Sequence, residues 1–597
     1  MLNGRLYRAA FVPFLIALGI AAFSLGSRPQ PLTSTLAPEA FEGSQAFSEL
    51  RSLAAAYPNR RPGSAGDDAL AAHIAAAIRG LASAGGAGFT VRTVQVEGQT
   101  IEGERPLRTV IAERPGSTDA PPVLIVAHRD AAQPGSLAEL SGTAALLELA
   151  RVFSTRETKR AIILVSTSGG SGGYAGAAQL ASLLHGPLDA AIVLGDLAGT
   201  SAHRPFVIPF SDGLGSAPLQ LQRTVSDAIT EQTGTSPGEP SALGQVAHLA
   251  FPFAAGEQGV LDANGVPSVL VQVSGERGPT AREPVSEERL GTFGRSVLSA
   301  VDALDSSPDV SQTMQNSVLL DRQTVPAWAL RLLLATLLLP PLITGADGLA
   351  RARRRRLSPG RWCLWALTCA LPFMVCAIFV YLLSATGLMG ATPQGALLPA
   401  ALPFHGTAIS AVVACVLVFA LSWLVWGLFV RRLGWDWRPD SEVAGLSVML
   451  VLLVVGVLVL VLNTFSALLL LPALHLWLLL ASPELRPRRL GALLLVVLGI
   501  VPLALLVAFY ARELGLGPGE VAWTGVLLLA GGQIGFGGAL IWSVGLGCAA
   551  AMALVALGSP EPAPGTKAAV DRHVSIRGPI SYAGPGSLGG TESALRR

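Results

Sequence analysis

The sequence predicts a two-part protein, an α/β domain followed by a polytopic α-helical membrane bundle. Two observations lead to this prediction. Hydrophobic residues make up 51% of the 597 residues and charged residues only 14%, whereas soluble domains carry about 25% charged residues. The long apolar runs gather after residue 325, and the segment 28–324 instead alternates short apolar runs with helical periodicity. We therefore expect the later part to lie against lipid and the earlier part to lie in water.

The charge and cysteine content exclude several classes of protein. The net charge is +2, from 42 basic and 40 acidic residues, so no global field attracts nucleic acid. Lysine occurs only at Lys159 and Lys567, and the abundance of Ala, Gly and Leu favours a GC-rich bacterial genome. No disulfide framework or cysteine zinc site is available to the polar half, because the cysteines all lie in later apolar stretches: Cys363, Cys369, Cys376, Cys415 and Cys548.

The N-terminus carries an apolar run of 18 residues, 9–26, behind Arg5 and Arg8. This run is long for the core of a cleaved signal peptide and just long enough to span a bilayer as a helix. We expect residues 1–27 to form an uncleaved transmembrane anchor. A cleaved signal peptide would equally export the segment that follows.

The exported segment 28–324 is expected to fold around a largely parallel sheet. The expected strands are 90–96, 107–113, 122–127, 161–166, 190–195, 205–209 and 268–273. The expected helices are 67–83, 141–154, 174–184, 218–232 and 286–304.

Residues 325–558 are expected to form a bundle of about seven transmembrane helices, near 326–346, 362–384, 407–430, 443–462, 464–481, 490–510 and 521–557. The last stretch is too long for one straight helix. Its glycine-rich segment 531–538 is either a turn between two short helices or a packing stretch in one tilted helix, so eight and nine spans remain open. The tail 559–597 is rich in Pro, Gly and Ser, and we expect it to be disordered.

Arginine clusters predict the orientation. They lie at 351–356, at 431–432, and at Arg486 with 488–489, and each alternates with a loop that is almost free of Lys and Arg. Positive residues mark cytoplasmic loops, so the segment 28–324 is expected outside the cytoplasm. We expect an integral protein of a bacterial plasma membrane.

Four ordered motifs carry a resemblance to a known family. Residues 61–64 (Arg-Pro-Gly-Ser) precede an amphipathic helix. An apolar strand leads into His128-Arg129-Asp130, residues 141–142 (Ser-Gly) open the next helix, and a further strand delivers Asp196. This set resembles the zinc aminopeptidases of peptidase family M28, and it implies an aminopeptidase-like mixed sheet with flanking helices. The overall plan resembles the peptidase-like membrane subunit of GPI transamidase.

The resemblance implies a two-zinc site, and several of its residues are missing here. His128 and Asp196 match metal ligands, and Asp130 matches the carboxylate that orients the histidine. Ala138 stands where the family has the bridging Asp, and the adjacent Glu139 is expected to point elsewhere. The segment 168–173 (Ser-Gly-Gly-Ser-Gly-Gly) replaces the pair of glutamates that supplies the general base, and the segment 274–278 offers no final histidine ligand.

We therefore predict a pseudopeptidase with no catalytic residue and no cofactor, in which Asp130 pairs with a vestigial ligand His128. It would act as a binding or scaffolding component of a membrane complex, contacting the bilayer and a protein or peptide partner. The expected cleft lies near Glu139, Gly170 and Ser171 at the carboxyl ends of the strands.

Two alternatives remain. An active zinc-dependent membrane metallopeptidase would use a rearranged single-metal site that recruits Glu139 or Glu276. A transporter-like bundle with a sensing α/β domain would need polar groups at mid-membrane. The ionisable residue His475 lies in the middle of an expected span, and we expect a hydrogen bond within the bundle for it.

Overall fold

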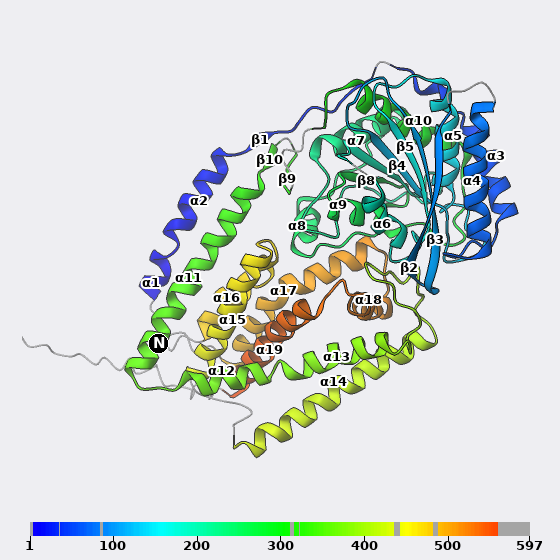
Figure 1. Ribbon diagram of the computed structural model, residues 1–597. Helices are drawn as coiled ribbons and strands as arrows, with labels where there is room; N and C mark the ends of the chain where they lie inside the picture. Colours follow the sequence, from blue (N-terminus) through cyan, green and yellow to red (C-terminus); the bar gives the residue numbers. More distant parts are fainter. Residues whose placement is uncertain are drawn as a thin grey trace, which may run out of the picture.

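The computed structural model describes residues 4–34, 36–83, 88–184, 186–310, 316–321, 323–434, 442–480 and 488–558. The tail 559–597, expected to be disordered, lies outside these described residues. The chain folds into a mixed α/β domain and a set of long apolar helices beside it (Figure 1). This is the predicted fold class.

The α/β domain is built on a seven-stranded sheet with the order β2-β3-β5-β4-β6-β8-β7. The central strands β5, β4, β6 and β8 are parallel, while β2, β3 and β7 pair antiparallel at the edges. The sheet is therefore mixed, with a parallel centre. Its strands are β2 (Thr90–Thr100), β3 (Gly103–Arg114), β4 (Val123–His128), β5 (Ile162–Thr167), β6 (Ala190–Leu194), β7 (Val207–Ile208) and β8 (Ser268–Val271).

Each expected strand is present, although the expected strand 205–209 shrinks to two residues. The central strands are fully buried because apolar side chains point to both faces. In β4, for example, Ile125 faces one hydrophobic core, and Leu124 and Val126 face the other.

Helices cover the two faces of the sheet. The helices of the first core are α3 (Gly43–Ala56), α4 (Ala65–Ser83), α5 (Ser141–Thr155), α7 (Leu219–Thr233) and α10 (Glu287–Ser306). On the opposite face lie α6 (Ala175–Leu183) and α9 (Glu257–Ala263). That second core also contains Ala396 and Leu514 from the helical part of the chain. The sheet thus packs directly onto the bundle.

The sequence did not predict α3, α9 or α8 (Ala242–Ala250). The helix α9 has only seven residues and α8 only nine, which is too short for a helical period to stand out from the surrounding apolar residues.

A small antiparallel sheet joins the two parts of the molecule. It contains β1 (Gly26–Ser27), β10 (Gln323–Val325) and β9 (Val318–Leu319) in that order. The strand β1 follows helices α1 (Gly4–Ala9) and α2 (Val12–Phe23), and β10 precedes α11 (Ala327–Arg354). Because β1 pairs with β10, α2 and α11 lie side by side (Figure 1).

Seven helices within the described residues are long and apolar enough to cross a membrane. One is the N-terminal segment Gly4–Phe23. The others comprise α11, the segment Pro359–Ala385 formed by α12 (Pro359–Thr368) and α13 (Leu371–Ala385), α14 (Thr407–Arg432), α15 (Glu442–Leu462), α17 (Arg489–Glu513) and α19 (Phe536–Gly558). These segments indicate an integral membrane protein.

The expected full span at 464–481 is wrong in length. The described chain has a 3₁₀ turn at Ser466–Leu469 and α16 at Leu471–Leu480, together a shorter apolar segment. The cause is the polar start of this stretch. Asn463 Nδ2 donates to the carbonyl of Leu249 (2.8 Å), and Ser466 Oγ donates to the carbonyl of Ala250 (2.5 Å). These bonds hold the first turn against the α/β domain.

The long stretch 521–557 is divided by a turn, as the first of the two alternatives had it. The helix α18 (Pro518–Ala530) ends at Gly531, and α19 begins at Phe536. The start of α18 lies beside the α/β domain, and its end lies beside this domain and the connection between α13 and α14. Gly515 packs near Arg277, Gly395 N donates to Gly531 O (2.9 Å), and Gln533 Nε2 donates to Pro252 O (3.0 Å). The helix α18 therefore begins and ends on the same side of the bundle.

His475 has the bundle hydrogen bond expected for it. Its Nδ1 lies 2.7 Å from the Tyr7 hydroxyl of α1, and its Nε2 lies 3.0 Å from the carbonyl oxygen of Leu337 in α11. The ring thus joins α16 to α1 and α11.

Candidate functional site at the carboxyl ends of the strands

A cleft of about 90 Å³ opens where the parallel strands end. Its walls carry His128, Glu139, Gly170, Glu257 and Glu276. Its roof comes from the connection between α13 and α14, which contributes residues 396, 398, 400 and 401. A Cβ added at Gly173 would lie 2.6 Å from Pro393 Cβ, so the roof sits directly on the loop after β5. The helical part of the chain therefore closes this site from one side.

His128 is the last residue of β4, and its ring packs against the backbone of Gly170. A Cβ built at Gly170 would lie 2.3 Å from His128 Cβ and 2.4 Å from His128 Cγ. Real Cβ atoms do not approach this closely, so only glycine fits beside the ring. The loop after β5 thus has no room for a side chain at this point.

Asp130 binds that same loop rather than His128. Gly170 N donates to Oδ1 (3.0 Å), while Ser171 N (3.0 Å) and Ser171 Oγ (2.6 Å) donate to Oδ2. Both carboxylate oxygens are occupied by these donors. The expected pairing of Asp130 with His128 is therefore replaced by a carboxylate that fixes the glycine loop, because two free backbone N–H groups and a hydroxyl offer better-placed donors.

A buried ion pair fixes the end of β4 between these two residues. Arg129 Nε lies 2.8 Å from Asp67 Oδ1, and both side chains are fully buried. Arg129 also donates to the carbonyls of Arg108 (2.6 Å) and Thr167 (3.0 Å), while Ser168 Oγ donates to Asp67 Oδ2 (2.6 Å). A buried pair of this kind needs such extra hydrogen bonds to offset desolvation. It holds β4, β5 and α4 in one fixed arrangement under the cleft.

Glu139 points into the cleft, contrary to the expectation that it would point elsewhere. It is half-buried, and desolvation raises its pKa, opposed by the charges of His128 and Arg60. The atom Glu139 Oε2 has no hydrogen-bond partner among the described residues. The buried cation Arg60 interacts favourably with its charge, and Arg60 Nη2 donates to Ser136 O just before Glu139.

Glu257 is a cleft residue that the sequence did not reveal. It begins α9, it is fully buried, and its Oε2 lies 4.0 Å from His128 Nδ1. Thr167 Oγ1 at the end of β5 donates to its Oε1 (2.5 Å), and its Oε2 has no hydrogen-bond partner among the described residues. Burial raises the pKa of Glu257, and His128 opposes that rise. No motif surrounds Glu257, and it lies far from His128 in the chain, so no local sequence signal pointed to it.

Asp196 follows β6, and its side chain closes its own loop. Its Oδ1 accepts from Ala198 N (3.1 Å) and Gly199 N (2.7 Å), while its Oδ2 has no hydrogen-bond partner among the described residues. Burial raises its pKa from 3.8 to about 6, and the two N–H groups oppose that rise. Asp196 does not line the cleft with His128.

Glu276 connects the cleft to the helical part of the chain. Its Oε1 lies 3.1 Å from His248 Nε2, and the hydroxyl of Tyr510 in α17 lies 3.2 Å from His248 Nδ1. The same hydroxyl donates to the carbonyl of Phe251 (2.8 Å). The His248 ring stacks on Phe210 with ring centroids 3.5 Å apart. A chain of contacts therefore runs from the cleft to a candidate membrane helix.

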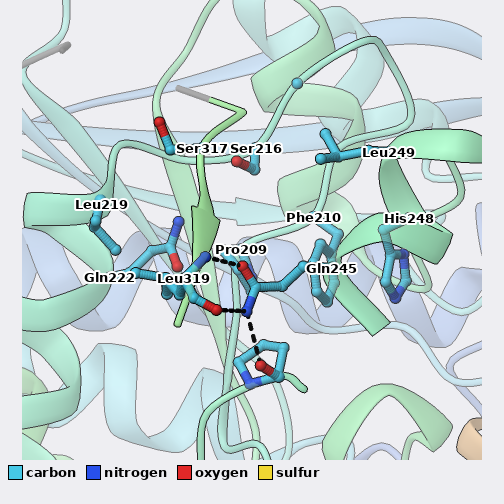
Figure 2. Close-up of a pocket in the computed structure, with 12 residues that line it drawn as sticks. Pro209, Phe210, Ser216, Leu219, Gln222, Gln245, His248, Leu249, Ser317 and Leu319 are labelled. Atoms are coloured by element: carbon cyan, nitrogen blue, oxygen red, sulfur yellow. Dashed lines mark hydrogen bonds between the residues drawn. The ribbon is translucent and has the colours of Figure 1, made fainter. Parts of the chain in front are cut away.

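A second cavity, of about 20 Å³, lies beside His248 (Figure 2). It has space for about one water molecule. The amide of Gln245 crosses it, since Nε2 donates to the carbonyl of Pro240 (2.9 Å) and Oε1 accepts from Leu319 N (2.7 Å). The bond to Leu319 joins α8 to β9, so this cavity lies where these two elements meet.

The residues of the cleft do not fit a two-zinc centre. No group of three or more His, Cys, Asp or Glu side chains is placed to hold a metal ion in the part of the chain that the structure describes. Asp130 is bound to the loop, Asp196 is bound to its own turn, and Gly170 leaves no space for an acidic side chain. The remaining donors, His128, Glu139 and Glu257, face the cleft, with 4.0 Å between His128 Nδ1 and the nearer oxygen of Glu257.

Comparison with known proteins is consistent with this architecture. Residues 109–255 match the model of Peptidase family M28. No curated protein matches the chain.

Among solved structures, the chain is similar to the LapA aminopeptidase of Legionella pneumophila (14% identity, 47% of this chain and 79% of that chain, TM-score 0.37). It is also similar to a glutaminyl cyclase from an Acidobacteriales bacterium (16%, 47% and 99%, TM-score 0.35). A third similar structure is the zinc aminopeptidase BSAP of Bacillus subtilis (13%, 44% and 94%, TM-score 0.34).

The M28-like region contains part of the cleft. His128, Glu139 and Gly170 lie inside the match, whereas Glu257 and Glu276 lie beyond its last residue. The acidic wall of the cleft is therefore completed by residues outside the matched region.

Proposed function

We propose that this protein is a membrane-anchored pseudopeptidase whose M28-like domain binds a partner instead of cleaving it. The observation that carries this proposal is the contact between Gly170 and the ring of His128. The resemblance to family M28 puts the two catalytic glutamates in the loop after β5. Here that loop packs against His128 without side chains at its closest point, and it occupies both oxygens of Asp130.

The cleft favours a positively charged group on the partner. Glu139, Glu257 and Glu276 each have one carboxylate oxygen without a hydrogen-bond partner among the described residues. Buried carboxylates without partners are costly, and an ammonium or guanidinium group from a peptide would satisfy them. A volume of about 90 Å³ suits one such group rather than a whole peptide. The partner would be a protein or peptide of a membrane complex, held by a charged side chain or chain end.

We further propose that the domain lies outside the cytoplasm. The loops that touch it, around Asn463 and at 386–406, carry no Lys or Arg. The arginine clusters at 351–356 and 431–432 lie at the C-terminal ends of α11 and α14. Positive residues favour the cytoplasmic side, which supports a plasma-membrane protein with the cleft exposed to the exterior.

Metal content of the full-length protein in detergent tests the proposal. Mass spectrometry on the unsubstituted protein and on His128→Ala is expected to find no stoichiometric zinc in either sample. An assay with N-terminal amino-acid amides is expected to find no hydrolysis.

The matched control is His73→Ala, because His73 lies half exposed on α4 with Glu49 as its neighbour, away from the cleft. Stoichiometric zinc that is lost in His128→Ala but kept in His73→Ala would overturn the proposal. That result would indicate a metallopeptidase with a rearranged site built on His128, Glu139 and Glu257.

A further inference from the structure

A separate apolar cavity lies within the helical part of the chain. It has a volume of about 280 Å³. The helices α17, α18 and α19 supply most of its lining, and Phe251 and Phe253 of the α/β domain close one end. Its aliphatic lining includes Leu506, Leu514 and Leu528. It does not share a lining residue with the acidic cleft.

Both hydroxyl groups of this lining are already used. Tyr510 donates to the carbonyl of Phe251 (2.8 Å), and Thr524 Oγ1 donates to the carbonyl of Glu520 (2.7 Å). The cavity therefore offers neither hydroxyl for the recognition of a polar headgroup. A cavity of about 150 Å³ with leucine, isoleucine and phenylalanine walls stays free of water and binds benzene, and this one is larger and lined mostly by apolar side chains.

The cavity opens to the outside of the bundle. Val507 of α17 lines it and is 47% exposed, and Gly525 of α18 lines it and is also exposed. A Cβ added at Gly525 would meet no atom within 4 Å. The helix α18 packs on α13 and α14, while α17 packs on α16 and α19. The opening thus lies at a seam between two groups of helices, beside α17, which is a candidate membrane span.

We propose that this cavity binds a single hydrocarbon chain of a membrane lipid. An α-helix of a partner is about 10 Å in diameter and does not fit a volume of about 280 Å³. A polar ligand would find both hydroxyls occupied. A flexible acyl chain enters sideways from the bilayer and needs only apolar contact.

A bound acyl chain would also support the acidic cleft through a series of side-chain contacts. Tyr510 forms part of the cavity wall, and its hydroxyl lies 3.2 Å from His248 Nδ1. His248 in turn holds Glu276, which lines the cleft. An acyl chain against the Tyr510 ring keeps this series of contacts in place. This inference stands whether or not the cleft is catalytic.

Photocrosslinking of the full-length protein in nanodiscs tests the proposal. The probe is phosphatidylcholine with a diazirine near the end of one acyl chain, present as a trace in unlabelled phosphatidylcholine. We expect crosslinks to concentrate on peptides from α17, α18 and α19 that line the cavity. The substitution Gly525→Phe fills the opening and is expected to lower this labelling about tenfold, as a loss of about 1.4 kcal/mol in binding would.

The matched control is Gly427→Phe in α14, because a Cβ at this half-exposed glycine also meets no atom within 4 Å. It should leave the labelling of the cavity unchanged. If Gly525→Phe does not fold, Leu546→Phe fills the same cavity from α19. Even labelling of all outward-facing helices, or an equal loss of labelling in the cavity-filling and control variants, would overturn the proposal.

Discussion

At the residue scale, Gly170 shows how closely the loop after β5 packs on the end of β4. The space that a side chain would need there contains the ring of His128. Substituting a glutamate at this position would displace that ring, so restoring the family's acidic residues one by one would also disturb the histidine. The absence of a side chain at Gly170 and the packing of His128 are therefore one structural feature rather than two.

Asp196 is the residue for which we expect a measurable dependence on pH. Burial raises its pKa from 3.8 to about 6. A carboxyl with a raised pKa in the folded state stabilises the fold below its unfolded pKa, and this contribution is lost as the pH rises through the folded value. A rise of about two units corresponds to about 3 kcal/mol. The window of change therefore runs from about pH 4 to somewhat above pH 6.

The substitution Asp196→Asn tests this directly. The amide oxygen keeps the acceptor for Ala198 N and Gly199 N but carries no charge. We expect a higher melting temperature than that of the unsubstituted protein at about pH 7.5, and equal melting temperatures at about pH 4. Thermal unfolding in detergent measures both. A variant that is less stable at both values would show that the ionised carboxylate stabilises its loop.

The residues of the site differ in how far the sequence could predict them. His128 ends an apolar strand next to a charged pair, so its place at the carboxyl end of the sheet followed from the chain alone. Glu257 comes from a helix of seven residues that brings it within 4.0 Å of His128. Only the three-dimensional packing of α9 on the sheet reveals that neighbour. The place of Glu139 on the cleft wall and the buried Arg60 that interacts with its charge were equally hidden in the sequence.

At the scale of elements, the buried strands were the most predictable features and the short helices the least. The central strands have apolar side chains on both faces, which gives continuous apolar runs. The sequence also predicted helices such as α5 and α10 to within about two residues, the usual uncertainty of a helix end. The segment 464–481 was predicted too long because its hydropathy outweighed the polar contacts of Asn463 and Ser466.

The packing of α16 on α17 leads to a prediction for the bundle. A Cβ at Gly499 would lie 2.3 Å from Trp477 Nε1 and 3.0 Å from Ala473 Cα, so the helices approach closely only because this residue is glycine. We expect Gly499→Ala to lower stability by about 1–3 kcal/mol, seen as a lower melting temperature in detergent. Gly427→Ala in α14 has free space for its Cβ and should not lower the melting temperature. An equal effect of both substitutions would contradict the close packing.

At the scale of the whole molecule, the two parts share one interior. The second core of the sheet includes Leu514 of the helical part, and the roof of the cleft is the connection between α13 and α14. The α/β domain is therefore not a separate unit tethered by a linker. A movement of the bundle would change the roof, and a ligand in the cleft would contact both parts.

The arginine clusters at the C-terminal ends of α11 and α14 bear on the orientation of the molecule in the membrane. The helix α18 begins and ends beside the α/β domain, and neither α18 nor the apolar segment Ser466–Leu480 is long enough to count among the candidate membrane spans. Positive residues favour the cytoplasmic side, so we propose that the M28-like domain lies outside the cytoplasm.

Thiol labelling in intact cells tests this orientation. Ser117 lies on the exposed surface of the α/β domain, and Ser358 is exposed in the loop after the first arginine cluster. A membrane-impermeant maleimide is expected to label Ser117→Cys in intact cells and Ser358→Cys only after lysis. The unsubstituted protein gives the background, which should be low because its cysteines are buried or half-buried. The reverse pattern would place the cleft in the cytoplasm, where the partner and the arginine rule would both have to be reconsidered.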